Sequence, residues 1–184
     1  DLQRLSPTRR VKGAEGLADL LRLLGPLTAA EAAARMQQPE TEDSGAAAGS
    51  ATEHQAVTLL AELVAANRAL RIRLGGQEHY AAIEDAARLR DALGVALPMG
   101  VPLAFIEPVT DPLGDLVSRY ARTHGPFTAT EAGAALGLGA AVVLQVLQRL
   151  ATERRVTEGR YRPGGTGPPG PLEAEWCEVE VLRR

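Results

Sequence analysis

Residues 125–165, GPFTATEAGAALGLGAAVVLQVLQRLATERRVTEGRYRPGG, carry the signals for two helices and a hairpin in close succession. Thr128 and Glu131 have the spacing of a capping box, in which the hydroxyl and the carboxylate each accept a backbone N–H at a helix start. Gly137 is the usual kind of residue at a helix end. A second helix is predicted from Ala140 to about Arg154. Its apolar residues at i, i+3, i+4 and i+7 predict one buried stripe, made of Val143, Val146, Leu147 and Leu150.

Residues 155–162 follow this helix and are predicted to form a short hairpin with its turn at Glu158-Gly159. Alternate residues of a strand face opposite sides, so Arg160 and Arg162 are expected to point outward and Tyr161 inward. Two helices joined by a short glycine turn and followed by a hairpin are typical of a helix-turn-helix with a wing. The sequence therefore predicts a winged helix.

A second copy of this unit lies earlier in the chain. Residues 25–34, GPLTAAEAAA, match residues 125–134 at seven of ten positions, at an offset of 100. A second block matches at an offset of 87 (147 − 60), and it pairs Leu60, Leu63 and Arg68 with Leu147, Leu150 and Arg155. The first copy therefore holds about 13 additional residues (100 − 87). We assign them to residues 37–53, a polar stretch without apolar period that is interpreted as a flexible insertion.

The first copy is expected to contain helices over residues 14–24, 28–36 and 54–69, followed by its own wing. In residues 70–74, Leu70, Ile72 and Leu74 alternate with Arg71 and Arg73, which predicts a strand with an apolar inner face and two outward arginines. A turn at Gly75-Gly76 and a return strand over residues 77–83 complete this wing. Residues 84–93 are predicted to form an exposed helix ended by Gly94, and the Pro-rich residues 95–112 an extended segment packed between the units.

We therefore expect a mainly α fold with small β wings, in which tandem winged-helix (helix-turn-helix) units are joined by a helix and a Pro-rich linker. The expected divisions are a connector (1–13), a first winged-helix unit (14–83), a linker helix with the Pro-rich segment (84–112), a second winged-helix unit (113–163), and a loop with the start of a following module (164–184). Trp176-Cys177 is interpreted as the core anchor of that module. The chain starts at Asp1 without Met, and we expect it to be part of a longer polypeptide.

Composition restricts the possible chemistry. The net charge is −3, so any DNA contact must come from local patches of basic residues. Lys12 is the only lysine and lacks the glycine-rich Gly-Lys-Ser/Thr pattern of a phosphate-binding loop, so no nucleotide site is expected. One cysteine and three scattered histidines do not supply a zinc site, and we expect no metal, cofactor or catalytic residue in this chain. The single cysteine fits a reducing compartment, and no apolar run approaches about 20 residues, which predicts a cytoplasmic protein without a membrane partner.

Eight side chains are candidates for DNA contact. They are the polar residues opposite the apolar stripe of the last helix and the outward arginines of both wings: Gln145, Gln148, Arg149, Thr152, Arg160, Arg162, Arg71 and Arg73. A merely solvated face is the alternative interpretation of the helical set. His79 beside Tyr80 could stack on a base or be a surface strand pair. His124 and the Glu84-Asp85 pair are interpreted as residues of a helix end and a helix start.

Several blocks, in order along the chain, resemble the large helicase-related (Lhr) family; they are residues 80–94, 107–113, 119–127, 158–165, 175–177 and 181–184. The resemblance implies part of the C-terminal extension of a bacterial superfamily 2 DNA helicase acting in DNA repair. It also implies a motor elsewhere in the parent chain, where ATP and Mg are expected. The extension is thought of as tandem winged helices similar to those of winged-helix DNA glycosylases. Such a glycosylase has a Gln-x-Asp or Gln-x-Gln pair, and neither spacing occurs here.

Three functional hypotheses follow. The first is a non-catalytic module that binds single-stranded or duplex DNA and assembles with the rest of the helicase chain. The second is a structural module for homo-oligomerisation or protein docking, because winged helices also serve as docking scaffolds. The third is a glycosylase-like module.

Overall fold

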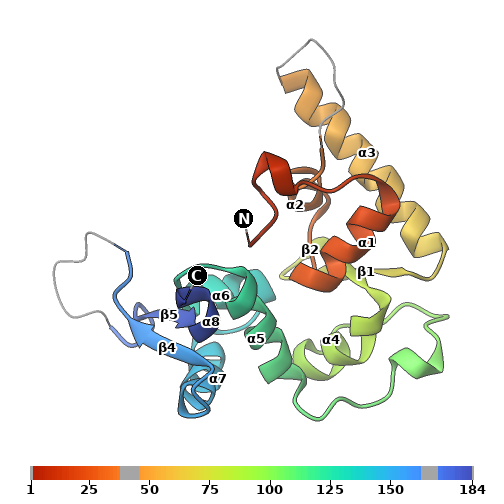
Figure 1. The fold of residues 1–184 in the computed structure, drawn as a ribbon. Helices are drawn as coiled ribbons and strands as arrows, with labels where there is room; N and C mark the ends of the chain where they lie inside the picture. The colour runs from red at the N-terminus through yellow and green to blue at the C-terminus, as the bar shows by residue number, and fades with distance from the viewer. Residues whose placement is uncertain (1, 38–45, 163–169, 184) are drawn as a thin grey trace.

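The computed structural model describes residues 2–37, 46–162 and 170–183 (Figure 1). The first unit contains α1 (Gly13–Leu24), α2 (Ala29–Ala33), α3 (Ala46–Ala65), β1 (Ala69–Leu74) and β2 (Gln77–Ala82). The single-turn helix η2 (Ile83–Asp85), α4 (Ala86–Leu93) and the short turn η3 (Leu103–Phe105) connect it to the second unit. That unit contains α5 (Pro112–Thr123), β3 (Phe127–Thr128), α6 (Ala129–Leu136), α7 (Ala140–Thr152), β4 (Val156–Gly159), β5 (Glu175–Glu178) and α8 (Val179–Leu182).

The capping box predicted at Thr128 and Glu131 is present, and the matching Thr28 and Glu31 of the first copy form a second one at the equivalent helix. At α2 the Thr28 N–H donates to the Glu31 carboxylate at 2.8 Å, and the Glu31 N–H donates to the Thr28 hydroxyl at 3.2 Å. At α6 the same pair of bonds joins Thr128 and Glu131, at 2.7 and 3.1 Å. The predicted stripe of α7 is also confirmed, because its four apolar side chains are all buried in the second core.

The repeat seen in the sequence is a repeat of backbone geometry. After α3, Asn67 has a φ of 54°, and after α7, Arg154 has a φ of 59°, at an offset of 87 (154 − 67), the same as that of the second matched block. The N–H of the following residue closes the same turn in both units, from Arg68 to the Leu63 carbonyl and from Arg155 to the Leu150 carbonyl, each at 2.9 Å. This bond from the residue after a left-handed position back into the last helical turn is the Schellman C-cap.

The second wing differs from the prediction. Glu158 and Gly159 do not form a turn: β4 continues through them and pairs antiparallel with β5, Glu158 opposite Trp176 and Gly159 opposite Glu175. The prediction was wrong because the true partner strand lies beyond residues 160–174, too far along the chain for a local turn signal to reveal it. Arg160, Tyr161 and Arg162 accordingly follow the strand instead of forming its return arm.

Trp176 belongs to the second unit instead of anchoring a following module. β5 pairs with β3 through Phe127 and Trp176, as Leu27 pairs with Tyr80 in the first unit. The Trp176 side chain is 2% exposed and lies in the same core as Val117, Phe127 and Leu147. Tyr80 and Trp176 are thus equivalent aromatic residues on the second wing strand of each unit.

Part of the predicted insertion is helical. α3 begins at Ala46 and ends at Ala65, so residues 46–53, expected to be flexible, extend the third helix, and the helix ends before the expected Ala69. The remaining insertion, residues 38–45, lies outside the described residues. Alanines at 46–48 and 51, which favour helix intrinsically, explain the extension.

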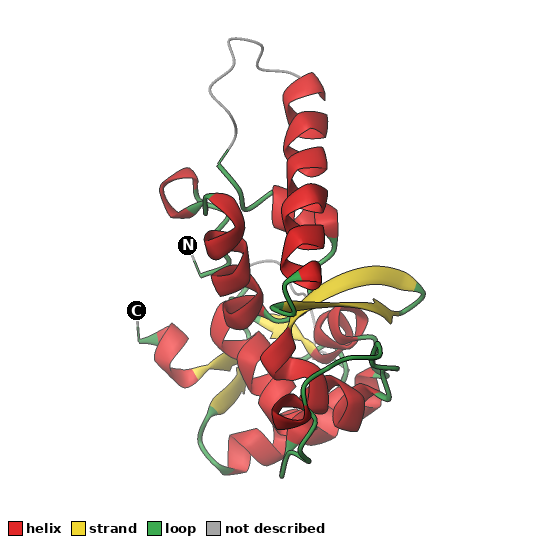
Figure 2. Ribbon diagram, turned by 90° about the vertical axis from the view of Figure 1, so that its right-hand side faces the viewer, coloured by secondary structure: helices red, strands yellow, loops and turns green. Residues whose placement is uncertain are grey.

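The first wing is confirmed, and it joins two cores. Figure 2 shows its yellow strands between the long helix α3 and the helices on the opposite side. Tyr80 packs with α1 and α3, whereas Leu70, Ile72 and Leu74 pack with α4, the Pro-rich segment and Leu116 of α5. The predicted packing of the Pro-rich segment between the units therefore agrees with the structure. α4 was expected to be exposed, but its Ala86, Ala87 and Leu89 are buried, and Ala86 and Leu89 belong to this cluster.

Within the described ranges no single helix is long and apolar enough to cross a membrane, although α6 and α7, bent by 116° at their junction, reach that length and composition as a pair.

Candidate nucleic-acid interface

The turn between α6 and α7 requires two glycines. Gly137 has a φ of 67° and ends α6, and such a positive φ is disfavoured for residues with a side chain. A Cβ on Gly133 would meet the Leu138 carbonyl oxygen at 2.7 Å, so the turn can pack closely on α6 only with glycine there. The bend of 116° between α6 and α7 falls in the range of a helix-turn-helix. As a result of this bend, the face of α7 opposite its buried stripe is exposed to solvent.

The four predicted residues of α7 lie on that outer face. Gln145, Gln148, Arg149 and Thr152 are all exposed, as their position opposite the buried stripe requires. The Thr152 hydroxyl donates to the Gln148 carbonyl at 3.0 Å. Arg149 forms ion pairs with Asp111 at 2.7 Å and with Glu153 at 3.4 Å, and the hydrogen bond with Asp111 raises the pKa of Arg149. The two glutamine amides are thus the donors on this face that no described side chain engages.

The predicted arginines after β4 do not share one strand face. Arg162 is bound on three sides, by Glu131 at 2.8 Å, by Glu175 at 3.5 Å and by the carbonyl of Pro126. Its hydrogen bond with Glu131 raises the pKa of Arg162. The Arg162 guanidinium therefore links the residues after β4 to the start of α6. Arg160 is exposed.

The two arginines of the first wing lie on the exposed side of β1. Arg71 is 3.8 Å from the Glu78 carboxylate on β2, and the Arg73 guanidinium donates to the Gly76 carbonyl at 2.9 Å. The tip of this wing also approaches the second unit, because a Cβ on Gly137 would lie 3.5 Å from the Gly75 nitrogen. The eight predicted residues lie on three parts of the chain, namely α7, the residues after β4, and β1.

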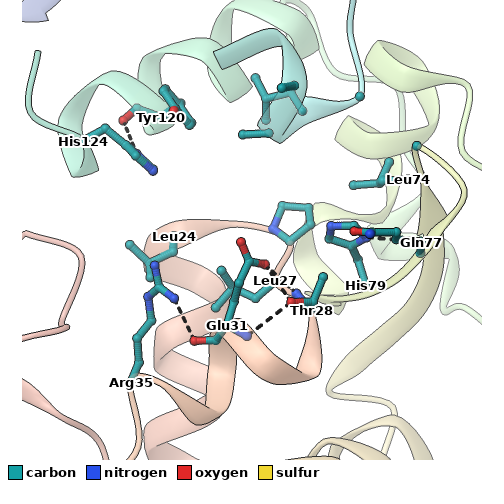
Figure 3. A pocket seen from close by; sticks show the side chains of 16 residues that line it. Leu24, Leu27, Thr28, Glu31, Arg35, Leu74, Gln77, His79, Tyr120 and His124 are labelled. Carbon is teal, nitrogen blue, oxygen red and sulfur yellow. Dashed lines mark hydrogen bonds between the residues drawn. The ribbon is translucent and has the colours of Figure 1, made fainter. Parts of the chain in front are cut away.

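A pocket of about 330 Å³, which the sequence did not predict, lies at this junction of the units. Figure 3 shows Tyr120 and His124 on one wall and Leu27, Glu31 and Arg35 on the opposite wall. The rings of Tyr120 and His124 are stacked, with centroids 3.7 Å apart and planes at 10°. Burial lowers the pKa of His124 and raises the pKa of Tyr120 to about 12.

The interpretation of His79 needs correction, whereas those of Asp85 and His124 as residues of a helix start and a helix end hold. His79 is buried, 9% exposed, and lines the pocket, so it is not on the surface. Asp85 lies at the start of α4, as predicted; its buried carboxylate makes no capping hydrogen bond and binds Arg88 and Arg119. His124 does lie at the end of α5, and its Nδ1 is 2.9 Å from the Tyr120 carbonyl.

Titratable side chains line the pocket, but the Glu31 carboxylate among them is already hydrogen-bonded within its own helix start. Glu31 accepts both the N–H and the hydroxyl of Thr28, at 2.8 and 3.0 Å. Among the described residues no group of three or more His, Cys, Asp or Glu side chains is arranged to hold a metal ion.

Comparison with known proteins gives a consistent result. Residues 1–108 match the family model described as the winged-helix domain of large helicase-related protein. The chain is 44% identical over 182 residues to a protein of Mycolicibacterium smegmatis named Lhr helicase/probable uracil glycosylase, covering 99% of the chain. It is 43% identical over 185 residues, along its whole length, to an Escherichia coli protein named Lhr helicase/uracil glycosylase. The chain spans 11% and 10% of the length of these two relatives.

Proposed function

The chain belongs to the large helicase-related (Lhr) family, and from this premise we propose that it is a DNA-binding and assembly module in the C-terminal extension of an ATP-dependent DNA helicase. The observation that supports DNA binding most strongly is the outer face of α7. This face follows a helix-turn-helix bend and presents two glutamine amides that no described side chain engages. Glutamine amides can donate to and accept from base edges in a groove.

The proposed contact is weak when the chain acts alone. Arg149 and Arg162 both have carboxylate partners, so fewer guanidinium groups are available for phosphate than the sequence suggests. Binding should be mostly non-specific, with a Kd on the order of 10⁻⁴–10⁻⁶ M at physiological salt. In the parent chain we place this module beside a motor that uses ATP and Mg, in the cytoplasm and in DNA repair.

The introduction of negative charge on α7 tests this function. The double variant Gln145→Glu/Gln148→Glu adds two negative charges to the outer face without touching the buried stripe. We expect it to weaken binding to a fluorescent DNA duplex and single strand at least tenfold by anisotropy. The control Met99→Glu/Ala104→Glu adds the same charge to exposed positions of the linker and should bind as the unmodified chain does. Equal weakening by both variants would show a net-charge effect and count against α7 as the interface.

A structural docking role is the second candidate. The ion pairs of Arg149 and Arg162 favour it, because both guanidinium groups stabilise contacts within the chain. It predicts that a partner or a second copy covers an exposed surface. Mass measurement in solution tests self-association: a concentration-dependent dimer without DNA binding would favour this role, whereas a monomer that binds DNA would favour the first.

The names of the two relatives also include uracil glycosylase. We propose that any base excision by the parent needs residues outside this chain, because the pocket carboxylate of Glu31 is held in a capping box. The test is incubation of the chain with uracil-containing DNA and detection of abasic sites. Excision by the chain that is lost in Glu31→Gln would contradict this proposal.

A further inference from the structure

A second cleft lies between the units, bounded by the N-terminal segment, α1 and α5. Its volume is about 550 Å³. Five of the eight residues that line it are arginines, namely Arg4, Arg9, Arg22, Arg119 and Arg122. None of its lining residues is acidic. In a chain with a net charge of −3, this is a local concentration of positive charge.

Three of these arginines carry a charge that no carboxylate of the described residues compensates. Arg22 pairs with Asp19 at 3.0 Å and Glu84 at 2.9 Å, and Arg119 with the buried Asp85. By contrast, Arg4, Arg9 and Arg122 have no acidic side chain within ion-pair distance in the parts of the chain that the structure describes. Arg9 and Arg122 are exposed, so an incoming anion can reach them.

The N-terminal segment is held in place beside the cleft. The buried Arg35 donates from Nε to the Gln3 carbonyl at 2.9 Å and from Nη2 to the Gln3 side-chain oxygen at 3.2 Å. The N–H of Arg9 closes a short turn onto the Ser6 carbonyl at 2.9 Å. Between them, Arg4 has a φ of 58°, which is unfavourable for a residue other than glycine. Backbone strain of this kind is concentrated at binding and active sites.

From this arrangement we infer that the cleft binds the phosphodiester backbone of a nucleic acid strand, with Arg4, Arg9 and Arg122 as the phosphate-binding residues. Guanidinium groups match phosphate oxygens with two parallel N–H donors, and several of them around one cleft can engage successive phosphates. The exposed Leu23, which also lines the cleft, offers an apolar contact beside the charges. This inference rests on the proposed DNA-binding function. It assigns the contacts to DNA phosphates to the cleft instead of to α7.

Two variants of equal charge test the cleft. Arg9→Gln/Arg122→Gln removes two guanidinium groups from it, whereas Lys12→Gln/Arg183→Gln removes two positive charges from exposed positions outside it. DNA affinity is measured by anisotropy at several salt concentrations. Each lost phosphate contact should reduce the magnitude of the slope of log K against log salt by about 0.9, so roughly 2 for the cleft variant and close to zero for the control.

Arg4 offers an independent variant, because glycine adopts its backbone conformation without strain. Arg4→Gly should retain or raise the melting temperature while it reduces the magnitude of the salt slope by about 1. A merely structural role of Arg4 would not change the slope.

The outcomes distinguish this inference from the proposed function. If the unmodified chain binds DNA but the cleft variants keep its slope, the cleft inference is wrong and the function stands. If the cleft variants lose binding while the α7 variant does not, the cleft stands and α7 is not the interface. If the chain binds no DNA at all, both fail. Calorimetric titration with inorganic phosphate separates the source of the anion: saturable phosphate binding without DNA binding would overturn the nucleic-acid assignment.

Discussion

Asp85 is the buried charge that joins the two units. Its side chain is 3% exposed, and its carboxylate binds Arg88 of α4 and Arg119 of α5, the latter through Nη2 at 2.8 Å. Arg88 also reaches the half-exposed Asp115 at 3.2 Å. One carboxylate thus compensates two guanidinium groups at the point where α4 packs on α5.

Replacement of Asp85 with Asn should destabilise the chain by about 3–5 kcal/mol, because it removes the carboxylate partner of the partly buried Arg119 and leaves Arg88 with the half-exposed Asp115 alone. Urea unfolding at neutral pH measures the loss. Asp115→Asn is the matched control: its side chain is 46% exposed, and a cost of only about 0–1 kcal/mol is expected. Equal costs for the two variants would contradict the role assigned to Asp85.

His124 makes stability depend on pH. Burial lowers its pKa below the usual value of 6.5, and the groups facing it are Tyr120, Arg35, Glu31 and Glu131. The unfolded chain therefore binds a proton at a higher pH than the folded chain does, and stability falls as the pH decreases below about 6.5. Unfolding free energies between pH 7.5 and 5.5 should show this decrease, and His124→Gln should reduce it. His54→Gln, at an exposed position of α3, should leave it unchanged.

At the scale of elements, the buried stripe of α7 is a central part of the hydrophobic core of the second unit. Leu147→Ala and Leu150→Ala should each cost roughly 2–5 kcal/mol in unfolding free energy, since both side chains are fully buried. The exposed Val142 on the same helix is the control, and Val142→Ala should change stability by less than about 0.5 kcal/mol. A cost near zero at either leucine would mean that this face of α7 is in solvent.

The sequence predicts elements well where the signal is local. Both capping boxes and the stripe of α7 depend on residues three or four positions apart, and the structure confirms them. The first wing was also predictable, because Gly75-Gly76 closes its hairpin directly. The second wing was not, because Trp176 meets Glu158 only after a long connection.

The candidate interface was less predictable, for the same physical reason. Exposure of Gln145 and Gln148 follows from helical periodicity. The ion pairing of the surface arginines does not follow from helical periodicity. Arg149 pairs with Asp111, which lies 38 residues earlier, and Arg162 pairs with Glu131, which lies 31 residues earlier. The cleft arginines come from three distant segments, so no sequence window contains them.

At the scale of the whole molecule, the two units form one assembly. The first wing packs against α4 and Leu116 of α5, and its tip approaches the turn at Gly137. Asp85 and the two interunit cavities lie along the same boundary. A ligand that contacts both α5 and the N-terminal segment would therefore engage both units at once.

The chain should neither bind nor hydrolyse ATP, because its only lysine, Lys12, lacks a glycine-rich phosphate-binding loop. A coupled ATPase assay of the pure chain, with and without DNA, measures this. DNA-stimulated hydrolysis that persists after further purification would contradict the assignment of the motor to another part of the parent protein.

The most direct test of DNA binding is the salt dependence of affinity for a labelled DNA single strand and duplex. We predict a Kd on the order of 10⁻⁴–10⁻⁶ M at physiological salt that tightens steeply at lower salt. Three phosphate contacts in the cleft give an expected slope of log K against log salt of about −2.7 for a duplex. The absence of binding at low salt, or an affinity that does not change with salt, would contradict the account.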